Sequence, residues 1–456
     1  MNKGAPGESS RSLRYELPAE VDFLRHIRYR GDMNTSKIIN IIFILILTGA
    51  GLCTGCKPKD NTPPGVSNHS DGQDTPATYA FAIDAEKYET ASSVIELPGP
   101  EYLISGETSL AMSNGIDGYL VKLGTGGTRL MERVYHNDGD QYFYQVIPAV
   151  DSGFIIMGLT NQHNANDWNI YLLKVDTAFN PVWEKNYGGP GRENCNDIIS
   201  TEEGTYVIAG DTIPAGKEKS DFCLWKIDAQ GNLLWEQTYG TDGTDTGRGV
   251  IQTNDEGFLL TGHGGVEDLN VYFIKTDADG NQQWSTTAGN DRRNWANSIT
   301  RTDDGASIAA GMTEYTTGDT QGVGIYAVKV DATGQVLWDK TYNFPGRAIC
   351  LSQSIGRTPD GNYIIGGSVQ HPDDIGFDLA LVKIDIDGDT IWQQIISGGS
   401  DQYEYTIQTL ATSDGGYLTV GYSSRKVEKE ENGQKRVFYI GRTGYVAKID
   451  NQGQLD

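Results

Sequence analysis

Residues Lys329–Tyr342, KVDATGQVLWDKTY, contain the pattern that decides the fold. An apolar strand ends in Lys329, Asp331 follows two residues later, Gly334 closes a short turn, and Trp338 lies in the next strand. Glycine supplies the positive φ that such a turn requires, and the aspartate side chain caps the bend. The stretch therefore predicts a β-hairpin, and its recurrence along the chain indicates a repeat.

Three landmarks recur in the same order through seven copies of this unit. The first is a glycine that ends an apolar strand, at Gly106, Gly158, Gly210, Gly262, Gly311, Gly367 and Gly421, with intervals of 52, 52, 52, 49, 56 and 54 residues. The second is the lysine, at Lys122, Lys174, Lys226, Lys275, Lys329, Lys383 and Lys448. The third is the tryptophan of five copies, at Trp183, Trp235, Trp284, Trp338 and Trp392.

Each unit contains four predicted strands. The third, such as DFCLWKID at 221–228, is apolar at consecutive positions, which indicates that both of its faces are covered. Short four-stranded sheets that are buried on both faces pack radially as the blades of a β-propeller, which also protects their edges. The sequence therefore predicts an all-β fold, a seven-bladed β-propeller of four-stranded antiparallel blades, over residues 78–456.

The two ends of the repeat region predict how the ring closes. The last copy stops at Lys448–Asp456, where its fourth strand would begin. TYAFAI at Thr78–Ile83 precedes the first copy and fits the place of that strand. We therefore expect a strand from the N-terminal end to complete the last blade.

The amino-terminal segment predicts export and a lipid anchor. The fifteen residues Ile38–Leu52 are mostly apolar, a length that is typical of a signal-peptide core and short for a membrane span. The run ends in Gly55 and Cys56, which resembles a bacterial lipobox. An uncleaved anchor helix is the alternative. We expect residues 1–32 to be a mis-assigned extension, 33–55 a lipoprotein signal peptide, Cys56 the lipidated residue and 56–77 a flexible tether to the membrane.

The residues after Cys56 bear on location. Lys57 stands where the familiar enteric rule places an aspartate for retention in the inner membrane. We therefore expect sorting to the outer membrane. Asp60 is an acidic residue shortly after the cysteine, which favours the cell surface over the periplasmic face.

Composition restricts the class of protein and of partner. Glycine accounts for 57 of 456 residues and proline for 15, which favours many short strands over collagen, coiled coil or disorder. The net charge is −25, and loss of residues 1–56 with seven basic and five acidic residues leaves −27. This charge repels phosphate backbones, so nucleic acid is not an expected partner.

The repeats resemble known propeller families. KVDATGQVLWDKTY is similar to the PQQ-type, or quinoprotein-like, repeat. The order DGGY-strand-G, KxDxxG and W-x-x-x-Y-G-G resembles the tandem repeats of lipid-anchored propeller proteins of Bacteroidetes-type bacteria, over Thr78–Asp456. The resemblance implies a propeller and not a dehydrogenase, because residues that stack the cofactor and bind calcium in true quinoproteins are not found. No cofactor is expected.

Motifs of common catalytic sites are absent from the sequence, which has no HExxH, GxSxG, P-loop or helix-opening GxGxxG. Asp385–Asp389 superficially resembles a calcium loop, but its glycine is fourth instead of sixth, so a turn is the better account and no metal is expected. We expect Cys195, Cys223 and Cys350 to be small buried hydrophobes and His163, His263 and His371 to be solvated loop residues.

A ligand site is expected where the copies differ, at the entry to the first strand of each blade. Arginines stand out there in an otherwise acidic chain, accompanied by aromatic residues. Arginine beside aromatic rings suits carboxylates or sugars, through forked hydrogen bonds and ring stacking. The alternative is that the arginines pair with neighbouring acids and the rings fill space between blades. The candidates are Arg192, Arg248, Arg292, Arg293, Arg347, Tyr142, Trp295 and Tyr403.

These observations leave three function classes. The first is a non-enzymatic, lipid-anchored module that binds glycan or protein. The second is a polysaccharide hydrolase or lyase that uses channel carboxylates, with Glu193, Asp197 and Glu404 as candidates. The third is a structural subunit of an envelope complex, which predicts a large exposed apolar patch.

Overall fold

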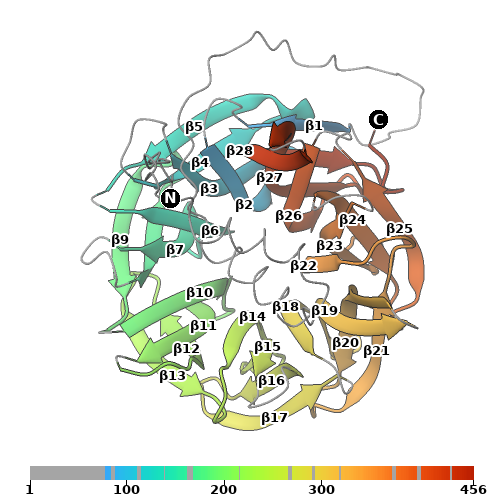
Figure 1. The fold of residues 1–456 in the computed structure, drawn as a ribbon. Helices are drawn as coiled ribbons and strands as arrows, with labels where there is room; N and C mark the ends of the chain where they lie inside the picture. Colours follow the sequence, from blue (N-terminus) through green and yellow to red (C-terminus); the bar gives the residue numbers. More distant parts are fainter. Residues whose placement is uncertain are drawn as a thin grey trace, which may run out of the picture. The chain divides into compact units, whose positions relative to one another are not determined.

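The computed structural model contains seven four-stranded antiparallel sheets arranged as blades around one axis, which confirms the predicted seven-bladed propeller (Figure 1). It describes residues 78–83, 88–109, 115–137, 139–161, 168–189, 191–214, 216–264, 270–289, 293–317, 320–371, 376–397, 402–431 and 434–455. The predicted extension, signal peptide, tether, Cys56, His163 and Arg292 lie outside the described residues.

Blades 1 to 6 follow one another along the chain, and in each the first strand lies nearest the axis (Figure 1). Blade 1 contains β2 (Tyr88–Leu97), β3 (Glu101–Ser109), β4 (Asp117–Leu123) and β5 (Arg129–Tyr135), with a 3-10 helix at Thr125–Gly127. Blade 2 contains β6 (Gln141–Pro148), β7 (Phe154–Thr160), β8 (Asn169–Val175) and β9 (Pro181–Tyr187). Blade 3 contains β10 (Gly191–Ser200), β11 (Tyr206–Pro214), β12 (Asp221–Ile227) and β13 (Leu233–Tyr239). Blade 4 contains β14 (Thr246–Gln252), β15 (Phe258–Gly264), β16 (Asn270–Thr276) and β17 (Gln282–Ala288). Blade 5 contains β18 (Asn294–Arg301), β19 (Ser307–Thr317), β20 (Thr320–Val330) and β21 (Val336–Tyr342). Blade 6 contains β22 (Cys350–Arg357), β23 (Tyr363–Gln370), β24 (Phe377–Ile384) and β25 (Thr390–Ile396).

Blade 7 joins the two ends of the repeat region. It contains β26 (Gln402–Ala411), β27 (Tyr417–Glu431), β28 (Gln434–Ile449) and, as its outermost strand, β1 (Tyr79–Ala82). β1 runs antiparallel to β28 and continues into Ile83, whose N–H donates to the Gly444 carbonyl at 2.7 Å. The predicted closure by Thr78–Ile83 is confirmed.

Each innermost strand contains a β-bulge opposite the landmark glycine. In blade 2 the register shifts between Phe143 and Gln145, which leaves Tyr144 without a partner across the ladder. A Cβ atom on any of the seven landmark glycines would lie 1.7 to 1.9 Å from a backbone carbonyl oxygen of that strand. Only glycine fits so close to the bulge.

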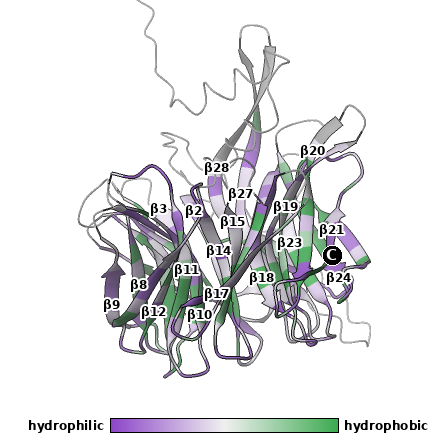
Figure 2. Ribbon diagram, turned by 90° about the horizontal axis from the view of Figure 1, so that it is seen from below, coloured by the Kyte–Doolittle hydropathy of each residue, from purple (hydrophilic) through white to green (hydrophobic). Residues whose placement is uncertain are grey.

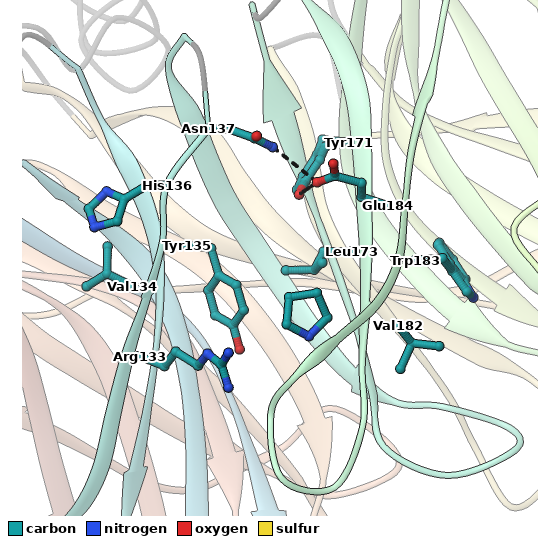
Figure 3. Close-up of a pocket in the computed structure, with 11 residues that line it drawn as sticks. Arg133, Val134, Tyr135, His136, Asn137, Tyr171, Leu173, Val182, Trp183 and Glu184 are labelled. Carbon is teal, nitrogen blue, oxygen red and sulfur yellow. Dashed lines mark hydrogen bonds between the residues drawn. The ribbon is translucent and has the colours of Figure 1, made fainter.

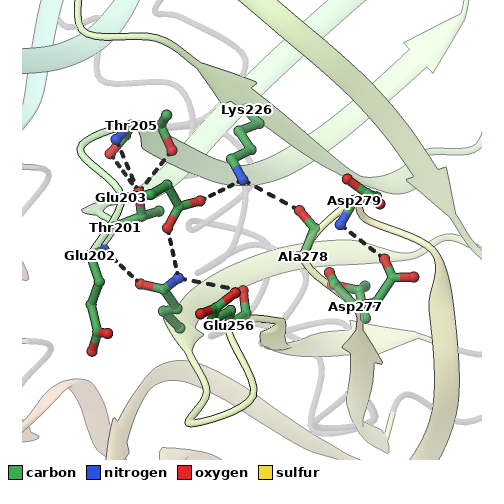
Figure 4. A network of polar contacts seen from close by, with 11 residues as sticks. Thr201, Glu202, Glu203, Thr205, Lys226, Glu256, Asp277, Ala278 and Asp279 are labelled. Carbon is green, nitrogen blue, oxygen red and sulfur yellow. Dashed lines mark hydrogen bonds and ion pairs between the residues drawn. The ribbon is translucent and has the colours of Figure 1, made fainter.

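The landmark lysine forms one ion pair inside every blade. Its ammonium group is 2.6 to 2.9 Å from an acidic group in or beside the turn between the first two strands in six blades, and Lys174 pairs with Asp151 in blade 2. In blade 3 Lys226 contacts Glu203 and also donates to the Ala278 carbonyl of blade 4 at 3.4 Å (Figure 4). The sevenfold repetition gives these pairs a structural role.

Tryptophans and tyrosines of the outermost strands connect consecutive blades. A Cβ on Gly231 would lie 3.1 Å from the Trp183 ring, so the ring packs on the turn of the next blade. The Tyr187 hydroxyl donates to the carbonyl of that same Gly231 at 2.8 Å. Tyr135, Tyr239 and Tyr342 make the equivalent bond. Apolar residues gather inside the blades, and the connecting loops are mostly hydrophilic (Figure 2).

Candidate binding site around the propeller axis

Seven bulged residues occupy equivalent positions on the innermost strands and differ from blade to blade. They are Ser92, Tyr144, Asn196, Arg248, Asn297, Gln353 and Ile407. Arg248 Nη1 donates to Asn196 Oδ1 at 3.0 Å, and Gln353 Nε2 donates to the Tyr405 hydroxyl at 2.6 Å. The repeated scaffold therefore presents non-repeated groups beside the axis.

Two of the predicted arginines act electrostatically on one buried carboxyl group in blade 3. Asp211 on β11 is 8% exposed and accepts a hydrogen bond from Asn194 Nδ2 at 3.4 Å. Burial raises the pKa of Asp211 to about 6, although the positive charges of Arg248 and Arg192 oppose the rise. Burial also lowers the pKa of Arg248, and Asp211 opposes that change. The sequence did not point to Asp211.

A third guanidinium, that of Arg442 on β28, lies among tyrosines of blades 7 and 1. Arg442 Nη1 donates to the Tyr88 hydroxyl at 2.9 Å, and its Cζ atom is 3.9 Å from the centre of the Tyr422 ring. Arg442 Nη2 is 3.8 Å from Glu107 Oε1. Burial raises the pKa of the Glu107 carboxyl, and Arg442 opposes the rise.

Arg442 was missed because the sequence search considered first strands, whereas β28 is the third strand of its blade. The sequence does contain a signal that could have identified Arg442. Arg442 stands six residues before its landmark lysine, and no other copy has a charge there. The equivalent residues are Ile116, Trp168, Ser220, Leu269, Val323 and Phe377.

The third guanidinium acts electrostatically on the predicted tyrosines, and the Tyr403 ring stacks on Tyr422 with centres 5.9 Å apart. Burial raises the pKa of both Tyr142 and Tyr403, and Arg442 opposes the rise in each. The Tyr405 ring stacks on Tyr422 with centres 5.3 Å apart, and the charges of both Arg442 and Arg248 act on its hydroxyl. Tyr405 therefore interacts electrostatically with both groups of residues. We call the following set the axial site: Arg192, Arg248, Arg442, Tyr88, Tyr142, Tyr144, Tyr403, Tyr405, Tyr422, Glu107 and Asp211.

The other predicted site residues lie apart from this set or in the packing. Arg347 donates to the Gln370 carbonyl at 2.7 Å and pairs with Asp378 at 3.1 Å, as the alternative interpretation expects. Trp295 is 1% exposed, so its ring faces are covered by protein. Arg293 is half-buried, with a buried Nη1 that makes no hydrogen bond to a described residue.

The carboxylates proposed for a hydrolase or lyase hold the scaffold together. Asp197 accepts from the Val250 N–H at 2.9 Å and from Gln145 Nε2 at 3.0 Å, which links blades 2, 3 and 4. Glu193 accepts from the Gly189 N–H at 3.3 Å and is 6% exposed. Glu404 takes the equivalent place on β26 and is buried.

The histidine prediction was wrong for His263 and only partly right for His371. β15 extends to Gly264, so His263 pairs in the ladder with Thr246 and is buried; burial holds its pKa well below the usual range. His371 follows the end of β23, as predicted, but its side chain is largely buried, with Nε2 3.1 Å from Asp378 Oδ1.

A cavity of about 480 Å³ lies away from the axis, between the outermost strands of blades 1 and 2 (Figure 3). Its polar groups bond to one another: Glu184 accepts from the Tyr171 hydroxyl at 2.8 Å and from Asn137 Nδ2 at 3.1 Å. The Arg133 guanidinium lies 5.6 Å from the centre of the Tyr135 ring. The cavity is lined by both acidic and basic side chains, and its polar groups largely form hydrogen bonds with one another.

Three other features concern the part of the chain that the structure describes. Cys195, Cys223 and Cys350 are buried, as predicted, and form no disulfide with one another. No three acidic, histidine or cysteine side chains there are grouped as metal ligands. None of the described helices has the length and apolar character needed to cross a membrane.

Comparisons with known proteins find only distant structural likenesses. No family model and no curated protein matches the sequence. A solved protein of unknown function from Dyadobacter fermentans is 11% identical, with 80% of this chain and 98% of that chain covered and a TM-score of 0.38. The β-propeller domain of the trilobed protease from Pyrococcus furiosus is 9% identical, with coverages of 79% and 94% and a TM-score of 0.42. Puromycin hydrolase is 14% identical, with coverages of 79% and 55% and a TM-score of 0.48. Such distant likeness carries no activity over to this chain.

Proposed function

We propose that this protein is a non-enzymatic binding module of the bacterial cell envelope, with its ligand held at the axial site. One observation carries the proposal. Arginines at positions where the repeated copies differ contact polar and aromatic side chains: Arg248 Nη1 donates to Asn196, and Arg442 donates to the Tyr88 hydroxyl and lies over the Tyr422 ring. Guanidinium and aromatic groups together suit carboxylates and sugar rings.

We assign no enzyme role because the candidate carboxylates take part in structural hydrogen bonds. Asp197 and Glu193 accept hydrogen bonds from backbone N–H groups and thereby stabilise the blades and loops. A hydrolase or lyase remains the second candidate because of Asp211, whose pKa of about 6 lies in the range of a general acid.

One experiment distinguishes a binding module from an enzyme that cleaves its ligand. The purified chain is mixed with fluorescent acidic and neutral oligosaccharides, and both anisotropy and reducing-end release are followed. Binding without release supports the module. Release that is lost in Asp211→Asn would establish the enzyme instead, and no interaction with any glycan or protein would contradict the proposal.

The proposed attachment is a lipid on Cys56 after removal of residues 33–55, with residues 56–77 as a tether at the outer membrane. It rests on the apolar run Ile38–Leu52 followed by Gly55 and Cys56. Replacement Cys56→Ala should release the protein from the detergent phase or leave an unprocessed precursor, whereas Cys53→Ala should do neither. Protease treatment of intact cells then tests the cell surface against the periplasmic face.

A further inference from the structure

Arg442 is held in one orientation by its neighbours. The Tyr422 ring lies 3.9 Å from Cζ on one side, the centre of the Tyr88 ring is 5.5 Å away, and the Tyr88 hydroxyl accepts from Nη1 at 2.9 Å. A guanidinium that is fixed between rings loses little rotamer freedom on binding, and its fork matches a carboxylate.

This guanidinium retains capacity for a ligand. Arg442 Nε is buried and makes no hydrogen bond to any described residue. The contact with Glu107 is 3.8 Å, which is longer than a hydrogen bond, and 21% of the Arg442 side chain is exposed. Because Glu107 lies beyond hydrogen-bond distance of Nη2, an incoming carboxylate that reaches the exposed part of the guanidinium would gain a charged hydrogen bond.

Arg248 supplies a second point of attachment. Arg248 is the bulged residue of the innermost strand β14, and its Nη1 donates to Asn196 Oδ1 at 3.0 Å. Its guanidinium is thereby held at the same level of the propeller as the other bulged residues.

The surroundings favour a saccharide over a protein as the carrier of that anion. Protein interfaces have an apolar core. The exposed large hydrophobic residues that the structure describes are Leu130, Val150, Val182, Leu233, Leu234, Val336, Leu337 and Ile391, and none lies on an innermost strand. The axial site instead offers tyrosine rings and hydroxyl groups, which suit the faces and edges of sugar rings.

We infer that the axial site selects a carboxylate-bearing saccharide of the uronic acid class, with the carboxylate bound by Arg442 and Arg248. The inference rests on the proposed binding function and names its ligand class.

The test compares ligands that differ only in charge. Full-length protein in mild detergent is titrated by calorimetry with oligogalacturonate, with its methyl ester, and with a sulfated and a neutral oligosaccharide of equal length. We expect the carboxylate form to bind at least roughly ten times more tightly than the ester, because a charged hydrogen bond is lost in the ester. The Arg442→Gln and Arg248→Gln variants should each lose a similar factor for the acid and little for the ester.

Matched variants keep the inference open to refutation. Arg442→Lys retains the charge without the fork and should recover only part of the affinity. Arg357→Gln removes an exposed arginine that pairs with Asp303 at the end of β22, and it should not change the affinity for any of the ligands.

If Arg442→Gln does not fold, the comparison of acid with ester and the Arg248→Gln variant still test the inference. Equal binding of acid and ester, or binding of only the sulfated form, overturns the ligand class while the binding function stands. Capture of a protein partner with no glycan binding overturns the inference, and no binding of any kind overturns both.

Discussion

The carbonyl oxygen of Tyr142 lies 1.7 Å from the position that a Cβ atom on Gly158 would take. The obstacle is backbone, so it cannot swing aside as a flexible side chain can. The bulge that places Tyr144 beside the axis is what brings this carbonyl so close. The β-bulge therefore has two consequences: it requires glycine at position 158, and it sets the position of Tyr144.

Replacement Gly158→Ala should destabilise the protein by about 1–3 kcal/mol or more, because the bulge must shift to admit one methyl group. Gly356 on β22 is the matched control, since a Cβ there meets nothing within 4 Å. Urea unfolding of both variants at pH 7 checks the difference. Equal stability of the two variants would contradict the role given to the landmark glycine.

The fold could be predicted because its requirements repeat. A bulge demands Gly158 and its six equivalents, a buried ammonium demands an acid near Lys329, and a tight turn demands Gly334, whose φ is 86°. Each requirement is local and appears seven times or nearly so, which makes it visible above the variation between copies. The closing strand was visible for the same reason, as a piece missing from one end and present at the other.

The candidate site was only partly predictable, because it depends on contacts between blades. Arg192, Arg248, Tyr142 and Tyr403 were found from their places on first strands. Trp295 has the same kind of place, yet its side chain is buried. Arg442 and Asp211 lie on third and second strands, and they interact with Tyr88 and Arg248 of neighbouring blades. Sequence spacing marks Arg442 as an exception among the copies, but it does not tell which side chains of another blade it contacts.

Replacement Ile83→Ala should weaken the closure of the ring. Ile83 is 4% exposed and packs with Ala91, Val94 and Val446, so the deleted methylene groups leave a cavity between blades 7 and 1. We expect a loss of about 2–5 kcal/mol, seen as a lower melting temperature. Leu130→Ala at an exposed position should stay within about 0.5 kcal/mol of the wild type. A shift of similar size in both variants would argue against a closing role for this strand.

Replacing the acid and replacing the lysine of such an ion pair should lower the free energy of unfolding by different amounts. Lys329 is 3% exposed and its ammonium group is 2.6 Å from Asp304, so Asp304→Ala leaves a buried charge with only a neutral acceptor, the Ile386 carbonyl at 3.3 Å. We expect Asp304→Ala to cost about 1–3 kcal/mol and Lys329→Met to cost less, because methionine fills the space without a charge. Chemical unfolding at pH 7 gives both values. A larger loss for Lys329→Met would show that the pair is net stabilising.

The two carboxyl groups Asp304 and Asp211 should make opposite contributions to stability as pH changes. Burial alone would raise the pKa of Asp304, but hydrogen bonds from Lys329 and Thr302 hold it at about 2, below the ordinary 3.8. Stability from Asp304 is therefore present above pH 4 and is lost as pH falls towards 2. Asp304→Asn should lose this dependence, which unfolding curves at pH 2.5 and pH 5 would measure.

Asp211 should act in the reverse direction, and Asp211→Asn tests it. Burial raises the pKa of Asp211 from 3.8 to about 6 in the folded protein, so the folded state holds the proton more tightly than the unfolded state. Its contribution is then complete below pH 4 and is lost as pH rises through 6, up to about 3 kcal/mol at 1.36 kcal/mol for each pH unit.

The titratable groups around Asp211 are Arg248 on β14, Arg192 and Cys195 on β10, and Cys223 on β12. Since arginine and buried thiol groups keep their charge state between pH 4 and 7, the change belongs to Asp211 itself. The stability of Asp211→Asn relative to wild type should increase between pH 4 and pH 7, and a constant difference over that range would mean that Asp211 keeps its charge on folding.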